Sequence, residues 1–347
     1  MDSTTAGTLP SAETGATLPA RGQTMKAIIR DRYGSADVLR LSEVEVPQVG
    51  DEEVLVRVRA AGLDRGAWHL MAGMPYLLRV AGYGLRRPKV AGLGSELAGV
   101  VEAVGANVTG LEPGEAVFGT CGASFAGYAS ARPDKLARMP ANVSFEQAAA
   151  VPVSAVTALQ ALRDRGRVKA GQHVLVIGAS GGVGTFAVQI AKALGANVTG
   201  VSSTQKVDLV RSLGADHVID YTRADITGDG KRYDVVLDIG GNRPLSRLRR
   251  VLTSDGTLVI VGGEGGGRWT GGIHRQLGAM VLSLFVRQRL GTFIAKPNGI
   301  DLNALRALIE AGSVTPAVDR VVALDQVPDA IRALTGGRVR GKIITAI

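Results

Sequence analysis

The sequence of 347 residues has one cysteine, Cys121, so it cannot form an internal disulfide or a structural zinc cluster of four cysteines. Aromatic residues make up only 4% of the chain, which leaves few stacking platforms for single-stranded nucleic acid. No apolar run approaches the roughly 18 residues that cross a bilayer. Residues 1–24 lack the apolar core of a secretory signal and are rich in Thr, Ala, Gly and Pro. We therefore expect a cytoplasmic protein with a disordered tail over residues 1–24.

The charge is basic but dispersed. Lys and Arg total 40 against 31 acidic residues, giving a net charge of +9. The densest basic runs, Arg86–Lys89 and Arg247–Arg250, are more typical of a solvated surface than of a nucleic-acid site. A hydrophobic content of 46% over this length predicts two globular domains.

The most informative stretch runs from His173 to Lys206. His173–Ile177 is a short apolar run suited to a strand buried on both faces. A glycine-rich turn follows, and then a helix whose apolar face has the 3.6-residue period. That face consists of Val183, Ala187, Ile190 and Leu194. A second strand at 197–201 completes a β–turn–α–β unit.

The turn has the residues that phosphate binding needs. Small residues allow a tight turn, close approach of backbone to a pyrophosphate, and close packing of helix on strand. The helix N-terminus directs unpaired N–H groups and partial positive charge at the phosphate. The cofactor-binding turn is predicted to consist of Ala179, Ser180, Gly181, Gly182, Val183 and Gly184.

The end of the second strand indicates which dinucleotide binds. NAD-binding units place a carboxylate there for the ribose 2′-hydroxyl, but residues 200–206 contain no acid. Ser202, Ser203 and Lys206 offer hydrogen bonds and a positive charge to a 2′-phosphate. The sequence therefore favours NADPH; the alternative is that Lys206 is a solvated first-turn residue.

These residues resemble the zinc-free, quinone oxidoreductase-like branch of the medium-chain dehydrogenase/reductase superfamily. The likeness rests on Ala179–Gly184 followed by Leu213–Tyr221, and it extends from Met25 to Ile344. It implies an α/β fold with a doubly wound parallel (Rossmann) sheet over 154–295. A GroES-like, mainly-β catalytic domain is implied over 25–153 and 296–347.

The resemblance also implies further contacts. Tyr221 and Lys206 would flank the 2′-phosphate, while Ile239, Gly262 and Gly263 would hold the nicotinamide half at strand ends. A last strand at 291–295 would be an exposed edge that pairs with a second subunit, giving a homodimer.

Other patterns predict the remaining elements. Residues 25–60 alternate as antiparallel strands, and short strands follow at 97–104, 116–118 and 127–129. The run 63–94 predicts a long irregular loop facing the substrate. A capping box at Ser144–Gln147 predicts a helix that continues towards Leu162. Later strands are expected at 217–219, 234–237 and 258–261, with a helix in which Pro244 takes a first-turn position.

The positions that bind catalytic zinc in relatives carry other residues. In the family alignment Asp64 stands for the first cysteine, Gly94–Glu96 for the Gly-His-Glu motif, and Val153 for the later cysteine. Catalytic zinc needs three protein ligands, and Asp64 with Glu96 does not provide them. We therefore expect no metal.

Hydride transfer without a Lewis acid requires an electrophilic acceptor such as a quinone or an α,β-unsaturated carbonyl. The catalytic candidates include His69 and Tyr76, and each of them is either a proton donor or a structural ring. The third candidate is Asp64, which replaces an asparagine that the family has beside the nicotinamide ribose. An ionised Asp64 accepts from a ribose hydroxyl but does not stabilise an oxyanion.

The sequence thus favours an NADPH-dependent reductase of a small quinone or enone, with no nucleic-acid or membrane partner. One alternative is a tailoring enoyl or ketone reductase in a secondary-metabolite pathway. Another is a non-catalytic NADPH-binding regulatory or RNA-binding protein, for which the scattered arginines are unfavourable.

Overall fold

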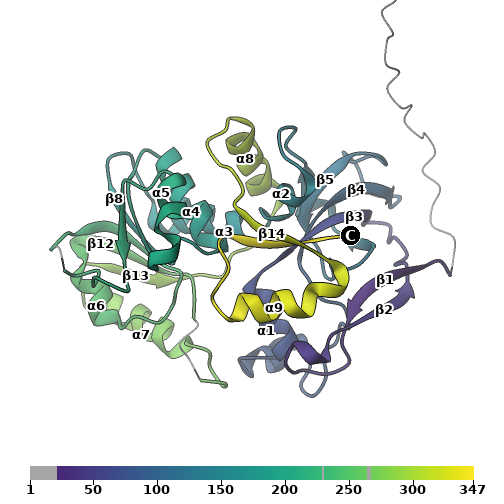
Figure 1. Ribbon diagram of the computed structural model, residues 1–347, viewed down its shortest axis with the longest axis horizontal. Helices are drawn as coiled ribbons and strands as arrows, with labels where there is room; N and C mark the ends of the chain where they lie inside the picture. Colours follow the sequence, from purple (N-terminus) through teal and green to yellow (C-terminus); the bar gives the residue numbers. More distant parts are fainter. Residues whose placement is uncertain (1–21, 229, 264–266) are drawn as a thin grey trace, which may run out of the picture.

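The computed structural model describes residues 22–228, 230–263 and 267–347. Two large sheets lie side by side, and strands from the C-terminal segment return to the sheet built by the N-terminal half (Figure 1). Residues 1–21 of the predicted tail lie outside the described residues. Thr24, also assigned to the tail, already belongs to the first strand.

The first sheet has six parallel strands in the order β10-β9-β8-β11-β12-β13. Its strands are β8 (His173–Ile177), β9 (Asn197–Ser202), β10 (His217–Asp220), β11 (Tyr233–Asp238), β12 (Leu252–Ile260) and β13 (Arg289–Thr292). Alternate side chains of β8 enter two separate cores: Val174 and Val176 face one, and Leu175 and Ile177 the other. Both faces are therefore covered, as the continuous apolar run predicts.

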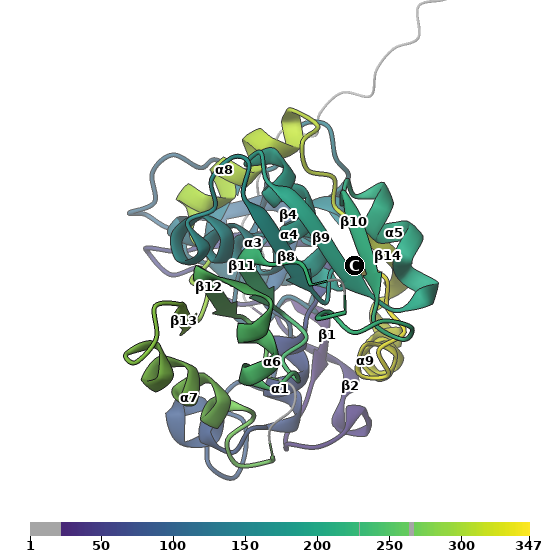
Figure 2. The ribbon, with the colours of Figure 1, turned by 90° about the vertical axis from the view of Figure 1, so that its left-hand side faces the viewer.

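Helices on the two faces complete the doubly wound unit (Figure 2). The first core receives α3 (Ser154–Gln160), α4 (Gly182–Ala193), α5 (Val207–Ser212) and α8 (Gly299–Glu310). The second receives α6 (Leu245–Arg250) and α7 (Ile273–Ser283). The predicted unit at 173–201 is confirmed, and Pro244 is the N-cap of α6 rather than a first-turn residue.

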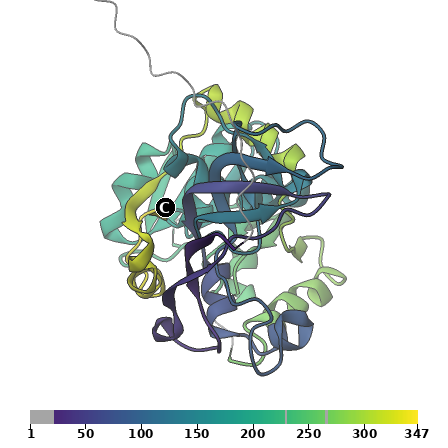
Figure 3. The same ribbon diagram turned by 90° about the vertical axis from the view of Figure 1, so that its right-hand side faces the viewer.

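The second sheet has seven strands in the order β14-β15-β3-β4-β5-β7, with β6 paired to β3. They are β3 (Val54–Leu63), β4 (Glu96–Val104), β5 (Ala116–Thr120), β6 (Tyr128–Ala131), β7 (Leu136–Arg138), β14 (Val318–Ala323) and β15 (Lys342–Ala346). A hairpin of β1 (Thr24–Ile29) and β2 (Arg40–Glu45) lies beside it (Figure 3). α9 (Val327–Thr335) packs on its core. A mainly-β unit beside a doubly wound parallel sheet confirms the predicted fold class.

Two local predictions are wrong. The helix expected from Ser144 to Leu162 is α2 (Phe145–Ala149) with its capping box, followed after a break by α3 and by η4 (Ala161–Gly166). Pro152 explains the break, because proline lacks an N–H and disfavours helical backbone before it. The loop expected over 63–94 begins with α1 (Arg65–Ala72), which is capped by Asp64 and by Gly73 at φ 60°, and later contains η2 (Arg79–Tyr83).

The remaining short helical turns are η1 (Ala36–Val38), η3 (Pro133–Lys135), η5 (Thr204–Lys206) and η6 (Leu324–Gln326). The last predicted strand, 291–295, forms as β13 and starts two residues earlier than expected.

The two sheets meet at the glycine-rich turn. Gly341, just before β15, forms a parallel bridge with Gly181, and its N–H donates to the Ser180 carbonyl at 2.9 Å. A Cβ on Gly182 would lie 3.0 Å from Lys342 Cδ and 3.2 Å from Ser154 Oγ. The turn is therefore packed against the mainly-β unit.

Candidate active site

The turn between β8 and α4 is open where a phosphate would bind. Gly181 is the N-cap of α4, and no side chain caps the helix. A Cβ on Gly181 would meet only the Gly178 carbonyl, at 3.6 Å, whereas a Cβ on Gly184 would be 2.0 Å from that same oxygen. Gly184 thus allows the tight packing, and Gly181 leaves room in front of N–H groups that lack intrahelical acceptors. This cradle fits a dinucleotide pyrophosphate.

The predicted nicotinamide contacts meet at neighbouring strand ends. Ile239 donates its N–H to the Ile177 carbonyl at 3.0 Å, and a Cβ on Gly262 would lie 2.0 Å from the Ile239 carbonyl. Gly263 is close to Gly271, because a Cβ added to Gly263 would lie 2.7 Å from the Gly271 carbonyl oxygen. The structure therefore brings the carboxyl ends of β8, β11 and β12 together, where open parallel sheets bind ligands.

The residues predicted for the 2′-phosphate lie at the end of β9, but Lys206 is already engaged. Its Nζ donates to the carbonyls of Gly337 and Val339, at 2.7 and 2.8 Å. Burial lowers the pKa of Lys206, with Arg340 adding to the effect and Asp319 opposing it. Ser202 is buried, while Ser203 is half-buried and Tyr221 is exposed.

Sequence reasoning missed a carboxylate beside this strand end. β10 pairs in parallel with β9, so Asp220 lies opposite Ser202. Its oxygens accept from Thr204 Oγ1 at 2.5 Å and Thr222 Oγ1 at 2.7 Å, and the Thr204 bond is the leading cause of its lowered pKa. The alternation of strands and helices predicts this pairing, but only once the strand order is known.

Asp64 lies at the end of β3 and is held by two hydrogen bonds. Its Oδ1 accepts from the Ala67 N–H at 2.8 Å, and its Oδ2 from Ser95 Oγ at 3.0 Å. Asp64 is therefore a helix cap as well as a site residue.

A buried ion pair, which the sequence did not reveal, lies next to Asp64. Lys342 Nζ contacts Glu96 Oε2, and the two side chains are almost fully buried. Glu96 Oε1 accepts from the Val153 N–H at 2.8 Å, at the break before α3. Burial raises the pKa of Glu96 to about 7, and the Asp64 charge adds to this while Lys342 opposes it. The pair links β4, β15, the start of α3 and the glycine turn.

His69 and Tyr76 differ in what they can donate. His69 Nδ1 lies 2.8 Å from the Met74 carbonyl. A carbonyl only accepts, so Nδ1 carries the hydrogen and Nε2 of the neutral ring is an acceptor. Only the imidazolium form of His69 would donate from Nε2.

Tyr76 is fixed by packing rather than by its hydroxyl. Its N–H donates to the Arg268 carbonyl at 2.9 Å, and its ring packs edge-on against Trp269 at 5.2 Å. The Arg79 guanidinium lies 4.7 Å from the ring centre. The hydroxyl makes no hydrogen bond to another described residue, so it is available to a ligand.

The positions that would hold catalytic zinc do not form a fitting donor set. Asp64 already accepts two hydrogen bonds, Ser95 offers a hydroxyl, and Val153 offers no side-chain donor. Across the described residues, no group of three or more His, Cys, Asp or Glu side chains is placed to hold a metal ion.

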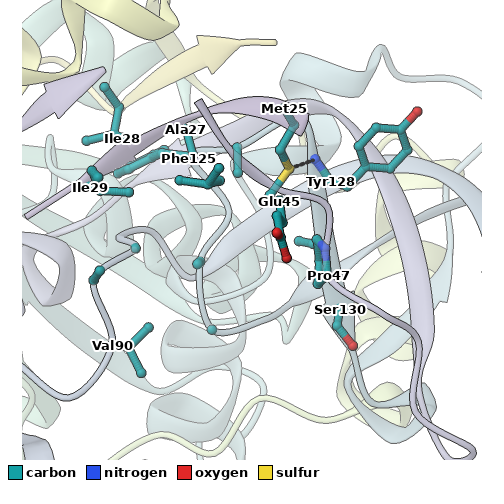
Figure 4. Close-up of a pocket in the computed structure, with 17 residues that line it drawn as sticks. Met25, Ala27, Ile28, Ile29, Glu45, Pro47, Val90, Phe125, Tyr128 and Ser130 are labelled. Carbon is teal, nitrogen blue, oxygen red and sulfur yellow. Dashed lines mark hydrogen bonds between the residues drawn. The ribbon is translucent and has the colours of Figure 1, made fainter. Parts of the chain in front are cut away.

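A separate apolar cavity of about 390 Å³ lies between the β1–β2 hairpin and residues 122–130 (Figure 4). Met25, Ile29 and Phe125 contribute to its walls, and Glu45 also lines it. None of the predicted site residues lines it.

Comparison with known proteins identifies the family. A family model described as an alcohol dehydrogenase GroES-like domain matches residues 50–161, and one described as a zinc-binding dehydrogenase matches residues 213–344. The 2-methylene-furan-3-one reductase of Solanum lycopersicum is 33% identical over 92% of this chain and 78% of its own length. The chain belongs to the medium-chain dehydrogenase/reductase superfamily.

Within this superfamily the similarity is to the quinone oxidoreductase-like branch. The NADPH-dependent alkenal/one oxidoreductase of Arabidopsis thaliana is 32% identical over 92% of this chain and 79% of its own. The Escherichia coli quinone oxidoreductase complexed with NADPH has a TM-score of 0.79 and 25% identity, covering 93% of this chain and 100% of its own. The expected branch and fold are confirmed.

Proposed function

We propose that this protein is an NADPH-dependent reductase of quinones or α,β-unsaturated carbonyls that works without a metal. The observation that carries the proposal is the glycine-lined N-terminus of α4, which no side chain caps. Relatives named as alkenal/one and quinone oxidoreductases support the acceptor class.

Bound NADPH supplies a hydride to an electrophilic carbon of the acceptor. The backbone N–H groups of Gly182 and Val183 hold the pyrophosphate, and the ends of β8, β11 and β12 orient the nicotinamide half. Tyr76 would donate a hydrogen bond and then its proton to the oxygen that gains charge, and would be reprotonated from solvent; Asp64 would accept from a ribose hydroxyl. His69 orients the Met74–Tyr76 turn through its bond to the Met74 carbonyl.

The choice of NADPH over NADH rests on Ser203, Lys206 and the nearby Arg340. Asp220 is the opposing feature, since a free carboxylate at this edge repels a 2′-phosphate. Its oxygens accept hydrogen bonds from Thr204 and Thr222, which lower its pKa and leave its negative charge in place, so the proposal depends on the donors and cations opposite it.

The domain boundaries at 153/154 and 295/296, the homodimer and the cytoplasmic location remain predictions. In the part of the chain that the structure describes, no helix is long and apolar enough to cross a bilayer.

The direct test follows absorbance of NADPH at saturating cofactor with a panel of quinones, enones and simple ketones. We expect turnover with quinones or enones, little with unactivated ketones, and the same rate after treatment with a strong chelator. Activity that disappears with chelation and returns with zinc would contradict the metal-free proposal. Turnover with NADH alone would contradict the cofactor assignment.

A further inference from the structure

The guanidinium of Arg79 is held by two tyrosine rings and by the end of α1. Its Cζ lies 4.4 Å from the centre of the Tyr33 ring and 4.7 Å from the centre of the Tyr76 ring. Its Nε donates to the Gly73 carbonyl at 2.8 Å, and its Nη2 donates to the Ala72 carbonyl at 3.3 Å. These contacts fix the planar group in one position beside the ring of Tyr76.

The positive charge at this place has no acid to balance it. Arg79 is half-buried and makes no ion pair with a residue that the structure describes, and residues 65–95 contain no Asp or Glu. A second guanidinium, that of Arg30, is 5% exposed and lies close enough to Tyr33 for their charges to interact. Arg30 donates to the Gly92 carbonyl, but its buried Nε has no acceptor in the described part of the chain. Buried charge without a counter-charge is costly, so the site favours an anion.

The charged site adjoins the strand end that is predicted to hold the nicotinamide half. Gly263, just after β12, is in close contact with Gly271, and a Cβ on Gly271 would lie 2.8 Å from Pro75 Cγ. Pro75 precedes Tyr76, whose ring contacts Arg79. An acceptor placed between the end of β12 and the Tyr76 hydroxyl would therefore have Arg79 beside it.

Arg79 keeps N–H groups available for a ligand. A guanidinium has five N–H donors, and the Gly73 and Ala72 carbonyls accept from its Nε and Nη2. No described residue accepts from Nη1, so the edge formed by Nη1 and the second hydrogen of Nη2 is open. Such an edge matches the two oxygens of a carboxylate, with two parallel hydrogen bonds.

We propose that the natural acceptor is an α,β-unsaturated carbonyl compound that carries a carboxylate, and that the open edge of Arg79 binds this carboxylate. The acceptor supplies the negative charge that the site lacks. Because its carboxylate and its reacting double bond belong to one molecule, binding at Arg79 also orients the acceptor oxygen towards the Tyr76 hydroxyl. This inference rests on the proposed function, since it names the acceptor class of the same site.

The experiment compares trans-β-acetylacrylate with its methyl ester, two enones that differ in charge. The measured quantity is the ratio of kcat/KM for the acid to kcat/KM for the ester, at saturating NADPH. We expect the wild type to reduce the acid at least as efficiently as the ester, although the ester is the more electrophilic compound. In Arg79→Met we expect the ratio to fall about thirtyfold, because only the acid loses a charge-assisted contact.

Arg86→Met is the matched control. Arg86 is exposed in the same segment and also lacks an ion pair with a described residue, so each variant loses one uncompensated charge. We expect its ratio to stay within about threefold of the wild-type ratio. Arg79→Lys keeps the charge without the planar edge, and we expect a ratio between those of the wild type and Arg79→Met. Circular dichroism and the Kd for NADPH confirm that each variant is folded.

The outcomes separate this inference from the proposed function. If Arg79→Met impairs acid and ester equally, Arg79 only supports Tyr76 and the end of α1, and the inference is overturned. An equal fall of the ratio in Arg86→Met overturns it too, because attraction at long range would then suffice. Both results leave the reductase proposal standing. A wild type that reduces no quinone and no enone overturns the proposed function and this inference with it.

Discussion

His69, in α1, and Tyr76, just after that helix, offer different chemistry. The Tyr76 hydroxyl makes no hydrogen bond to a described residue, whereas His69 uses Nδ1 to hold the Met74 carbonyl. Trp269 and Arg79 hold the ring of Tyr76 in place, and they leave its hydroxyl without a hydrogen-bond partner among the described residues. A donor that is positioned in advance costs little reorganisation when charge develops on the acceptor.

Tyr76→Phe keeps the ring and removes only the hydroxyl. We expect kcat with an enone to fall about a hundredfold while the Kd for NADPH is unchanged, because the interaction forms mainly in the transition state. Steady-state kinetics and fluorescence titration measure the two quantities. Tyr83→Phe, at a half-exposed ring elsewhere in the same segment, serves as the control. A wild-type kcat in Tyr76→Phe would assign proton donation to another group.

Glu96 makes the free energy of unfolding fall as pH rises, which is the opposite of the usual effect of a carboxyl group. Burial raises its pKa to about 7 in the folded state, against 4.5 for the solvent-exposed carboxyl of the unfolded chain. Between those values the folded state keeps a proton that the unfolded state has released. The free energy of unfolding contributed by Glu96 therefore falls as pH rises through this window, by at most ~1.4 kcal/mol per pH unit.

The test compares urea unfolding of the wild type and Glu96→Gln at several pH values. We expect the difference in free energy, wild type minus variant, to decrease from pH 4.5 to about 7 and then to level off, because Gln does not titrate. A difference that grows with pH would mean that the Lys342 ammonium outweighs burial and holds the carboxyl ionised.

At the scale of elements, the glycine-rich turn before α4 has two separate requirements, close packing and space for a ligand. Gly184 is required for packing, since its Cβ would meet the Gly178 carbonyl at 2.0 Å, but Gly181 has space around it. The requirement for glycine at 181 therefore comes from the ligand rather than from the fold. A substitution at Gly181 should therefore weaken NADPH binding without lowering the stability of the fold.

Gly181→Val should fill the space that the pyrophosphate needs. We expect the Kd for NADPH to rise about tenfold or more, with little change in melting temperature. Gly122→Val is the control, because a Cβ there meets nothing within 4 Å and Gly122 is not among the predicted cofactor-binding residues. A large loss of stability in Gly181→Val would mean that the turn itself, and not the ligand, demands glycine.

Local signals predicted some elements and missed others for identifiable reasons. The β8–α4–β9 unit was predictable because strand, turn and helix signals are contiguous. The capping box at Ser144 correctly marked the start of α2, but Pro152 was overlooked as its terminator. Asp64 and Gly73 are ordinary cap residues for α1, but the low charge and many glycines of residues 63–94 indicate a loop and conceal the helix.

At the scale of the whole molecule, the fold class was predictable and part of the site was not. Alternating strands and helices require a parallel sheet, so the strand ends that hold a nucleotide follow from the sequence. Glu96 and Lys342 are 246 positions apart, and nothing near either residue indicates the other. The same holds for Lys206, whose acceptors Gly337 and Val339 come from the C-terminal segment. Such contacts depend on how the two sheets meet.

The edge of the parallel sheet carries the last prediction, the homodimer. β13 pairs with β12 alone among the described strands, so its outer N–H and C=O groups are open to a second copy. Ile294, just beyond it, is 89% exposed. We expect sedimentation equilibrium to give a dimer, and Ile294→Asp to give a monomer because a charge would be buried in the contact. Ile300→Asp, at an equally exposed site on α8, should remain dimeric, and a monomeric wild type at micromolar concentration would contradict pairing through this edge.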